Sequence, residues 1–150
     1  MANIGIGVIG LGRMGQVYAR HVARQIASAA LVAVADPSGA ATEAFSAQVG
    51  GVTAYADYHD LLRDPQVQGV IIASPTSTHR DVVIAAADAG KAIFCEKPTA
   101  LTLSATDEML AAVDRAGVVF QVGFMRRFDR AYADAFAKIE SGLIGEPVNI

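Results

Sequence analysis

Residues 4–15 read Ile-Gly-Ile-Gly-Val-Ile-Gly-Leu-Gly-Arg-Met-Gly, and this stretch decides the fold. It begins with a short apolar run, which is typical of a strand buried on both faces of a parallel sheet. It closes with the spacing Gly10-x-Gly12-x-x-Gly15, and residues 13–28 then carry apolar side chains at near-helical spacing. The stretch therefore predicts a strand, a tight turn and a helix in direct succession.

Each glycine of this turn has a physical reason if the turn holds a dinucleotide. Gly10 permits the tight turn, Gly12 lets a pyrophosphate approach the backbone, and Gly15 lets the helix pack closely on the strand. The first amide groups of the helix then point at the phosphates, where the helix dipole favours negative charge. Arg13 and Met14 belong to this first turn, so we count them with the glycines as cofactor-binding residues.

An acidic residue closes the second apolar run. Asp36 directly follows residues 31–35 and lies at the distance from the glycines, about 20 residues, that the dinucleotide motif requires. A carboxylate there accepts hydrogen bonds from the adenosine ribose hydroxyls and repels the 2′-phosphate of NADP. The sequence therefore predicts NAD as the cofactor. The alternative left open is that the glycines only shape a turn and Asp36 only caps a helix.

Apolar runs alternate with helical segments along the rest of the chain. After the first strand, further strands are predicted at 31–35, 52–55, 69–73, 92–95 and 118–122. After the first helix, further helices are predicted at 38–49, 57–63, 76–89, 103–116 and 128–141. Strands separated by helices need a parallel sheet with right-handed crossovers. The predicted fold class is therefore α/β, a doubly wound parallel sheet of the Rossmann type.

Composition and charge limit the classes of partner. The 150 residues are 53% hydrophobic with a net charge of −3, which predicts a well-cored domain that binds neither nucleic acid nor a membrane. The single cysteine, Cys95, excludes an internal disulfide and a multi-cysteine metal site, so we expect a reducing cytoplasm and no metal. Because Cys95 lies in an apolar run, we interpret it as a packing residue rather than a nucleophile.

A lysine follows the fifth apolar run. Glu96-Lys97-Pro98 comes directly after residues 92–95, at the carboxyl edge where open α/β sheets bind their ligands. A lysine at this edge can face a nicotinamide and take the proton of a substrate hydroxyl as hydride leaves. The residues alone leave a plain surface lysine open as the alternative.

Three motifs occur together in the chain, namely the glycine turn, Ala73-Ser74-Pro75-Thr76-x-x-His79 and Phe94-Cys95-Glu96-Lys97-Pro98. In this combination they resemble the glucose–fructose oxidoreductase, inositol dehydrogenase and rhizopine catabolism (Gfo/Idh/MocA) family. Residues 121–129, Gln-Val-Gly-Phe-Met-Arg-Arg-Phe-Asp, are similar to the inositol 2-dehydrogenase branch. Residues 144–147, Ile-Gly-Glu-Pro, resemble the junction at which the family enters its second domain.

The resemblance implies roles for individual residues. Lys97 would be the catalytic lysine, and Pro98 would follow a cis peptide bond. Met125 and Arg126 would edge the nicotinamide and polyol pocket. The residues implied to contact the cofactor, besides the glycine turn and Asp36, are Ser74, Pro75, Thr76, His79, Glu96 and Lys97. Two alternatives stay open: His79 only hydrogen-bonds a neighbouring loop, and Arg126 is only solvated.

The resemblance also implies a division of the chain. Residues 1–123 would form the NAD-binding domain, and residues 124–150 the crossover helix and first strand, from Pro147, of a sheet-rich substrate domain that the chain lacks. The family's catalytic aspartate and histidine lie in that second domain. We therefore expect an NAD-dependent dehydrogenase of a polyol or sugar, myo-inositol first, whose 150 residues bind NAD(H) but turn over poorly or not at all.

Two other functions stay open, namely an isolated NAD(H)-binding module and a family member that acts on another sugar. Loss of the second domain would also expose an apolar face around Phe124, Phe128 and Tyr132. Such a face predicts self-association into a homo-oligomer or poor solubility.

Overall fold

A six-stranded parallel sheet forms the centre of the computed structural model, which describes residues 3–146 and 148. The strands are β1 (Ile4–Ile9), β2 (Ala29–Ala35), β3 (Thr53–Tyr55), β4 (Gly69–Ile72), β5 (Ala92–Cys95) and β6 (Phe120–Val122). They lie in the order β3-β2-β1-β4-β5-β6, and every neighbouring pair is parallel. The strand order reverses beside β1, and this switch point opens a crevice at the carboxyl ends of the strands. The predicted Rossmann sheet is confirmed.

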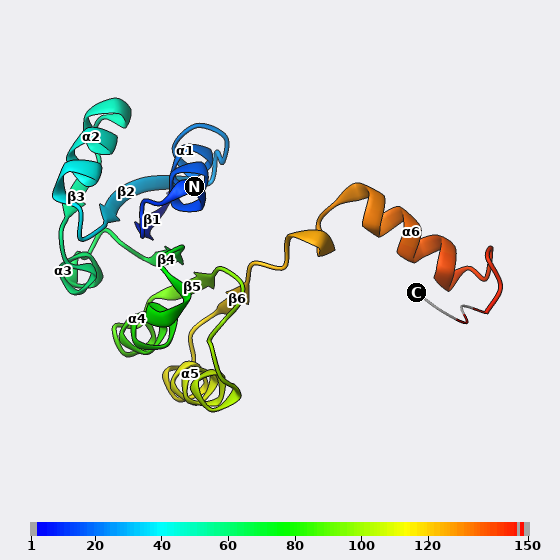
Figure 1. The fold of residues 1–150 in the computed structure, drawn as a ribbon. Helices are drawn as coiled ribbons and strands as arrows, with labels where there is room; N and C mark the ends of the chain where they lie inside the picture. Colours follow the sequence, from blue (N-terminus) through cyan, green and yellow to red (C-terminus); the bar gives the residue numbers. More distant parts are fainter. Residues whose placement is uncertain (1–2, 147, 149–150) are drawn as a thin grey trace.

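Helices cover both faces of the sheet (Figure 1). The covering helices are α1 (Arg13–Arg24), α2 (Gly39–Val49), α3 (Tyr58–Arg63), α4 (Thr76–Asp88) and α5 (Leu103–Ala116). A short 3-10 turn, η1 (Met125–Arg127), and a sixth helix, α6 (Arg130–Glu140), follow β6 and do not cover the sheet. One core joins the sheet to α3, α4 and α5 and contains Leu61, Val83 and Met109. A second core on the opposite face joins it to α1 and α2 and contains Val22 and Phe45. Burial of each such side chain contributes about 1.5–3 kcal/mol to folding.

The first helix and second strand differ at their ends from the sequence expectation. The helix predicted over 13–28 ends at Arg24, and β2 begins at Ala29 rather than at residue 31. The reason is the sheet register, in which Ile4 pairs with Ala29 and Gly5 with Ala30. These pairings draw both alanines into the ladder, so the helix must stop early enough to leave a turn.

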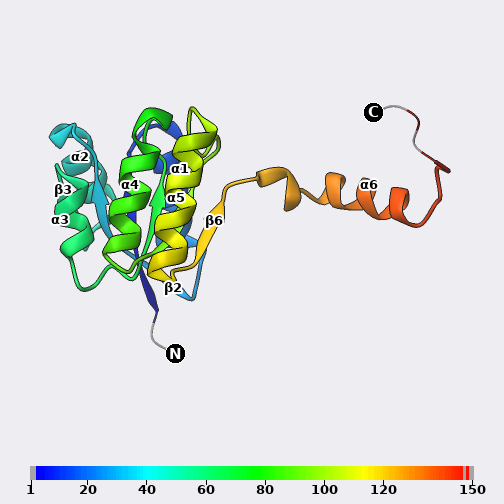
Figure 2. The same cartoon turned by 90° about the horizontal axis from the view of Figure 1, so that it is seen from below.

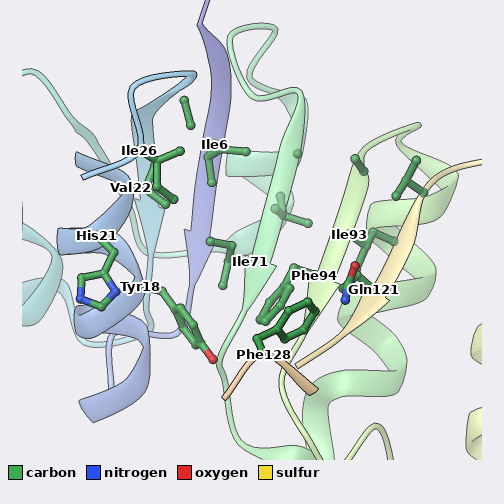
Figure 3. A pocket seen from close by; sticks show the side chains of 15 residues that line it. Ile6, Tyr18, His21, Val22, Ile26, Ile71, Ile93, Phe94, Gln121 and Phe128 are labelled. Carbon is green, nitrogen blue, oxygen red and sulfur yellow. The ribbon is translucent and has the colours of Figure 1, made fainter. Parts of the chain in front are cut away.

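One part of the sheet lies open on the α1 side. The strands β4, β5 and β6 are covered by α4 and α5 on the other face, whereas a hollow of about 600 Å³ remains on this one. Figure 3 shows apolar side chains from several strands facing it, with Phe128 at its rim. The strand residues that line it include Ile71, Ile93 and Phe94.

The chain after β6 leaves the sheet as an arm. Gly123 is the last buried residue before it, and all residues from 124 to 146 are exposed. Figure 2 shows α6 projecting away from the layered part of the molecule. The predicted helix 128–141 starts at Arg130 because the Asp129 side chain accepts hydrogen bonds from the amides of Ala131 and Tyr132. The predicted domain boundary at residue 123 stays a prediction.

Two sequence expectations concern the chain end and the membrane. The strand expected over Pro147–Ile150 falls outside the described residues apart from Val148, which is not in a strand. Within residues 3–146 and 148, no helix is both long and apolar enough to cross a bilayer. The cytoplasmic location stays a prediction.

Candidate functional site

The three glycines of the first turn have different surroundings. Gly10 has a positive φ of 90°, and a Cβ there would lie 2.6 Å from the Ser74 amide nitrogen. A Cβ at Gly15 would lie only 1.8 Å from the Gly10 carbonyl oxygen, so α1 packs directly on the turn. A Cβ at Gly12 would meet no atom within 4 Å. Packing therefore requires glycine at positions 10 and 15, whereas Gly12 keeps the space above the turn open.

The start of α1 provides donors beside that open space. Gly12 is the N-cap of α1 and has no side chain with which to occupy the first amides of the helix. Arg13 and Met14, which follow it, are exposed. Unpaired amides at a helix N-terminus, together with the helix dipole, attract an anionic group. The turn therefore fits a pyrophosphate against its backbone.

Asp36 ties the end of β2 to this turn. One carboxylate oxygen accepts a hydrogen bond from the Leu11 amide at 2.7 Å, and the other accepts from the Ser38 amide at 2.9 Å. The carboxylate is half-buried, so it keeps a side toward solvent. The bond to Leu11 was not predicted from the sequence, because the motif spacing locates the acid but not its partner in the turn. Asp36 thus fixes the glycine turn as well as facing the crevice.

A cavity of about 360 Å³ adjoins Asp36 at the carboxyl ends of β1, β2 and β4. Its lining includes Gly10, Asp36, Tyr58, Ser74, Pro75 and Thr78. The structure therefore brings four predicted residues together, whereas Thr76, at the first position of α4, is not part of this lining. Tyr58 and Thr78 had not been predicted, although each lies in the first turn of the helix that follows a strand at the binding edge, a position that could have indicated them.

His79 joins two loops of the site from inside the protein. It is 1% exposed, and its ring nitrogens lie 2.9 Å from the carbonyl oxygens of Pro98 and Ser74. Because each ring nitrogen faces a backbone carbonyl oxygen inside the protein, neither nitrogen is open to a cofactor. The geometry favours the second of the two sequence interpretations, a histidine that hydrogen-bonds neighbouring loops and so positions Ser74.

Lys97 lies just after the end of β5, and Glu96 forms a hydrogen bond with its backbone amide. The Lys97 amide donates to one Glu96 carboxylate oxygen at 2.8 Å, and the Tyr18 hydroxyl donates to the other. The peptide bond between Lys97 and Pro98 is cis, as the resemblance implied. The Lys97 side chain is exposed at the sheet edge. It is therefore free to meet a ligand there.

A second cavity, of about 470 Å³, contains Lys97. It is lined by Lys97, Gly123, Phe124, Met125, Arg126 and Arg127. The two predicted substrate residues, Met125 and Arg126, thus share a cavity with the predicted catalytic lysine. The Arg126 guanidinium also lies 5.0 Å from the centre of the Tyr132 ring, which links this cavity to the arm.

Cys95 contributes packing rather than chemistry. Cys95 is fully buried, and burial, helped by the nearby Glu96 charge, raises the pKa of its thiol to about 12. A thiol in that state is a poor nucleophile. Over the described part of the chain, no three His, Cys, Asp or Glu side chains are close enough together to hold a metal ion.

Comparison with known proteins gives consistent matches. A family model described as "Oxidoreductase family, NAD-binding Rossmann fold" matches residues 4–124. The scyllo-inositol 2-dehydrogenase (NAD(+)) of Bacillus subtilis (strain 168) is 44% identical over 141 residues, 94% of this chain and 41% of that protein. The myo-inositol 2-dehydrogenase of Thermotoga maritima is 41% identical over 142 residues, 95% of this chain and 42% of that protein.

Solved structures match in the same way. The scyllo-inositol dehydrogenase of Lactobacillus casei, with bound NAD(H) and scyllo-inositol, aligns with a TM-score of 0.92 at 32% identity. The alignment covers 96% of this chain and 43% of that one. The chain thus spans about two fifths of the length of these relatives.

Proposed function

We propose a function from the family: the chain belongs to the Gfo/Idh/MocA oxidoreductase family and is an NAD-binding Rossmann domain related to inositol dehydrogenases. The proposed function is that of the cofactor-binding domain of a polyol dehydrogenase. In the complete enzyme, hydride would pass between a ring carbon of the polyol, myo-inositol first, and the nicotinamide. The observation that carries this proposal is the shared cavity of Lys97, Met125 and Arg126 at the sheet edge that also holds the glycine turn.

The cofactor would lie along that edge from β2 to β5. Asp36 would accept from the adenosine ribose hydroxyls beside the 360 Å³ cavity, and the α1 amides after Gly12 would hold the pyrophosphate. Ser74, Pro75 and Thr76 would contact the middle of the dinucleotide, with His79 holding their loop from behind.

Lys97 would act at the reacting hydroxyl. NAD, when bound, supplies the hydride acceptor at nicotinamide C4. The exposed Lys97 amine would accept the hydroxyl proton at Nζ, and the Glu96 bond to its amide would hold the backbone beneath it. Met125 and Arg126 would border the polyol, whose hydroxyls suit the several N–H donors of a guanidinium.

The relatives' remaining length is the reason to propose binding without turnover. A chain that spans about two fifths of an inositol dehydrogenase would contribute the cofactor site and Lys97. We expect the 150 residues to bind NADH, and NADH formation from NAD and myo-inositol to stay far below ordinary enzyme rates. Turnover at an ordinary rate, followed at 340 nm, would contradict this part of the proposal.

Cofactor binding is tested by titration with NADH and NADPH. The Asp36→Asn variant should bind NADH about tenfold more weakly or worse, because a charge-assisted hydrogen bond is lost, while NADPH binding should not fall. Glu43→Gln removes the same charge from an exposed site on α2 and serves as the control. Equal losses for both cofactors would refute the role of Asp36.

Addition of myo-inositol or scyllo-inositol to the NADH complex separates the remaining functions. A change in nicotinamide fluorescence that is lost in Arg126→Ala would support a polyol site at Lys97. An isolated NAD(H)-binding module would ignore both inositols, and a response to a different sugar alone would point to another substrate within the family.

A further inference from the structure

Tyr18 is a polar residue of α1 to which neither the glycine motif nor the proposed chemistry gives a role. It lies on the helix that starts at the glycine turn, one helical turn after Gly15, and reaches across the sheet (Figure 3). Its ring packs edge-on against Phe94 of β5, with 5.4 Å between ring centres and planes inclined by 66°. Its hydroxyl donates to the Glu96 carboxylate, 78 positions along the chain. Tyr18 thus joins the cofactor helix directly to the end of β5.

The Glu96 carboxylate is held at both oxygens. One oxygen accepts from Tyr18, and the other accepts from the Lys97 amide at 2.8 Å. The carboxylate is half-buried, so its hydrogen bonds replace water that it would otherwise hold. If the phenol were removed, the carboxylate would regain freedom to turn toward solvent or toward the neighbouring Lys97 side chain.

The phenol is suited to act as a constant donor. Burial, followed by the hydrogen bond and charge of Glu96, raises the pKa of Tyr18 above its ordinary value. The hydroxyl therefore keeps its proton at neutral pH, and the direction of the bond from Tyr18 to Glu96 does not change over the range in which a dehydrogenase works.

We propose that Tyr18 is a positioning residue for Lys97, which it reaches through Glu96, and that it couples the pyrophosphate helix to the reacting end of β5. The coupling rests on the proposed function of Lys97, whereas the positioning concerns only contacts within the chain. An α1 that is tightened by cofactor at its N-terminus restrains the Tyr18 hydroxyl, and the restraint passes to the Lys97 backbone.

Amide hydrogen exchange of the ¹⁵N-labelled chain tests the positioning directly. In Tyr18→Phe, which keeps the ring and removes the hydroxyl, the Lys97 amide should exchange about fivefold faster or more, because its acceptor is released. The Glu96 amide is the internal reference, since it donates to the Ile72 carbonyl within the sheet at 2.9 Å. Its exchange should stay within about twofold of the unsubstituted protein.

Tyr55→Phe is the matched control. It deletes the same atom from a hydroxyl that donates to Asp64 at 3.2 Å, away from the lysine cavity. The proposal is overturned if Tyr18→Phe leaves Lys97 exchange unchanged, if it accelerates Lys97 and Glu96 equally, or if Tyr55→Phe accelerates Lys97 as much.

The coupling is tested by adding saturating NADH. It should slow Lys97 exchange in the unsubstituted protein by a larger factor than in Tyr18→Phe, while NADH affinity differs by less than about threefold, since the turn and Asp36 are unaltered. Equal slowing in both proteins would overturn the coupling. Failure of the chain to bind NADH would instead refute the proposed function, and the exchange comparison without cofactor would still decide the positioning.

Discussion

Helices α5 and α6 share their local signals but differ in what they bury. Each has a side-chain N-cap, Thr102 for α5 and Asp129 for α6, and each carries an apolar stripe. The α5 stripe is buried, with Met109 fully covered, whereas Phe136 of α6 is 61% exposed. Caps and periodicity therefore specify that a helix forms, and only a facing surface makes it part of the core. In the described residues α6 has its stripe without such a cover.

The largest expected effect is loss of the folded sheet in Gly15→Ala. The added Cβ would lie 1.8 Å from the Gly10 carbonyl, a clash of backbone that no side chain can relieve. We expect at least about 3 kcal/mol lower free energy of unfolding by urea denaturation. Gly39→Ala, where a Cβ meets nothing within 4 Å, should lose no stability. A well-folded Gly15→Ala protein would show that the turn is looser than described.

A matched pair of core and arm truncations comes next. Met109→Ala should lower the free energy of unfolding by about 2–5 kcal/mol, because it leaves a cavity between α5 and the sheet. Phe136→Ala removes a larger side chain from α6 but should cost less than about 0.5 kcal/mol. If both truncations cost the same in urea denaturation, α6 is packed in solution and the contrast fails.

Removal of the two N-caps should have a smaller effect on the free energy of unfolding, and the effect should differ between α5 and α6. Thr102→Ala removes the acceptor of the Ala105 amide and should lower the global free energy of unfolding by about 1 kcal/mol. Asp129→Ala should leave that quantity unchanged and lower only the helical population of residues 130–140, read from ¹³Cα chemical shifts. Global destabilisation by Asp129→Ala would mean that the arm supports the sheet.

The smallest effect on the free energy of unfolding is expected for substitutions in the arm that change self-association. The exposed arm predicts that the chain self-associates at high concentration, through the apolar side chains around Phe128 and Tyr132. Phe136→Ser with Ile139→Ser should restore the 15.6 kDa monomer in light scattering. Leu103→Ser, at a more exposed apolar position on α5, should not. A monodisperse monomer of the unsubstituted chain would contradict this prediction.

The sequence predicts the order and type of the elements well, because most strands are apolar runs, and glycine, proline or a polar residue separates them from the helices. It predicts their ends less well where pairing decides them, as at Ala29, which joins β2 through Ile4. The unaided pattern cannot show that the arm stands apart, since the periodicity of α6 is that of any amphipathic helix.

For the candidate site, motif spacing locates the residues but not the bonds between them. The glycine turn and Asp36 follow from local spacing, yet the bond from Leu11 to Asp36 depends on how two strands meet. The same holds for the link from Tyr18 to Glu96, whose residues are far apart in the chain. His79 illustrates the limit best, because only burial distinguishes a ligand contact from a loop support.

Because Cys95 is buried, the reactivity of its thiol can report on local opening of the sheet. It is the one sulfhydryl of the chain and sits at the end of β5, beside Glu96 and Lys97. Alkylating reagents should reach it only in molecules whose sheet has opened at that edge. The rate of alkylation in native buffer therefore measures, without any label, how often the strand beneath the proposed lysine comes apart, and a ligand that binds there should slow it.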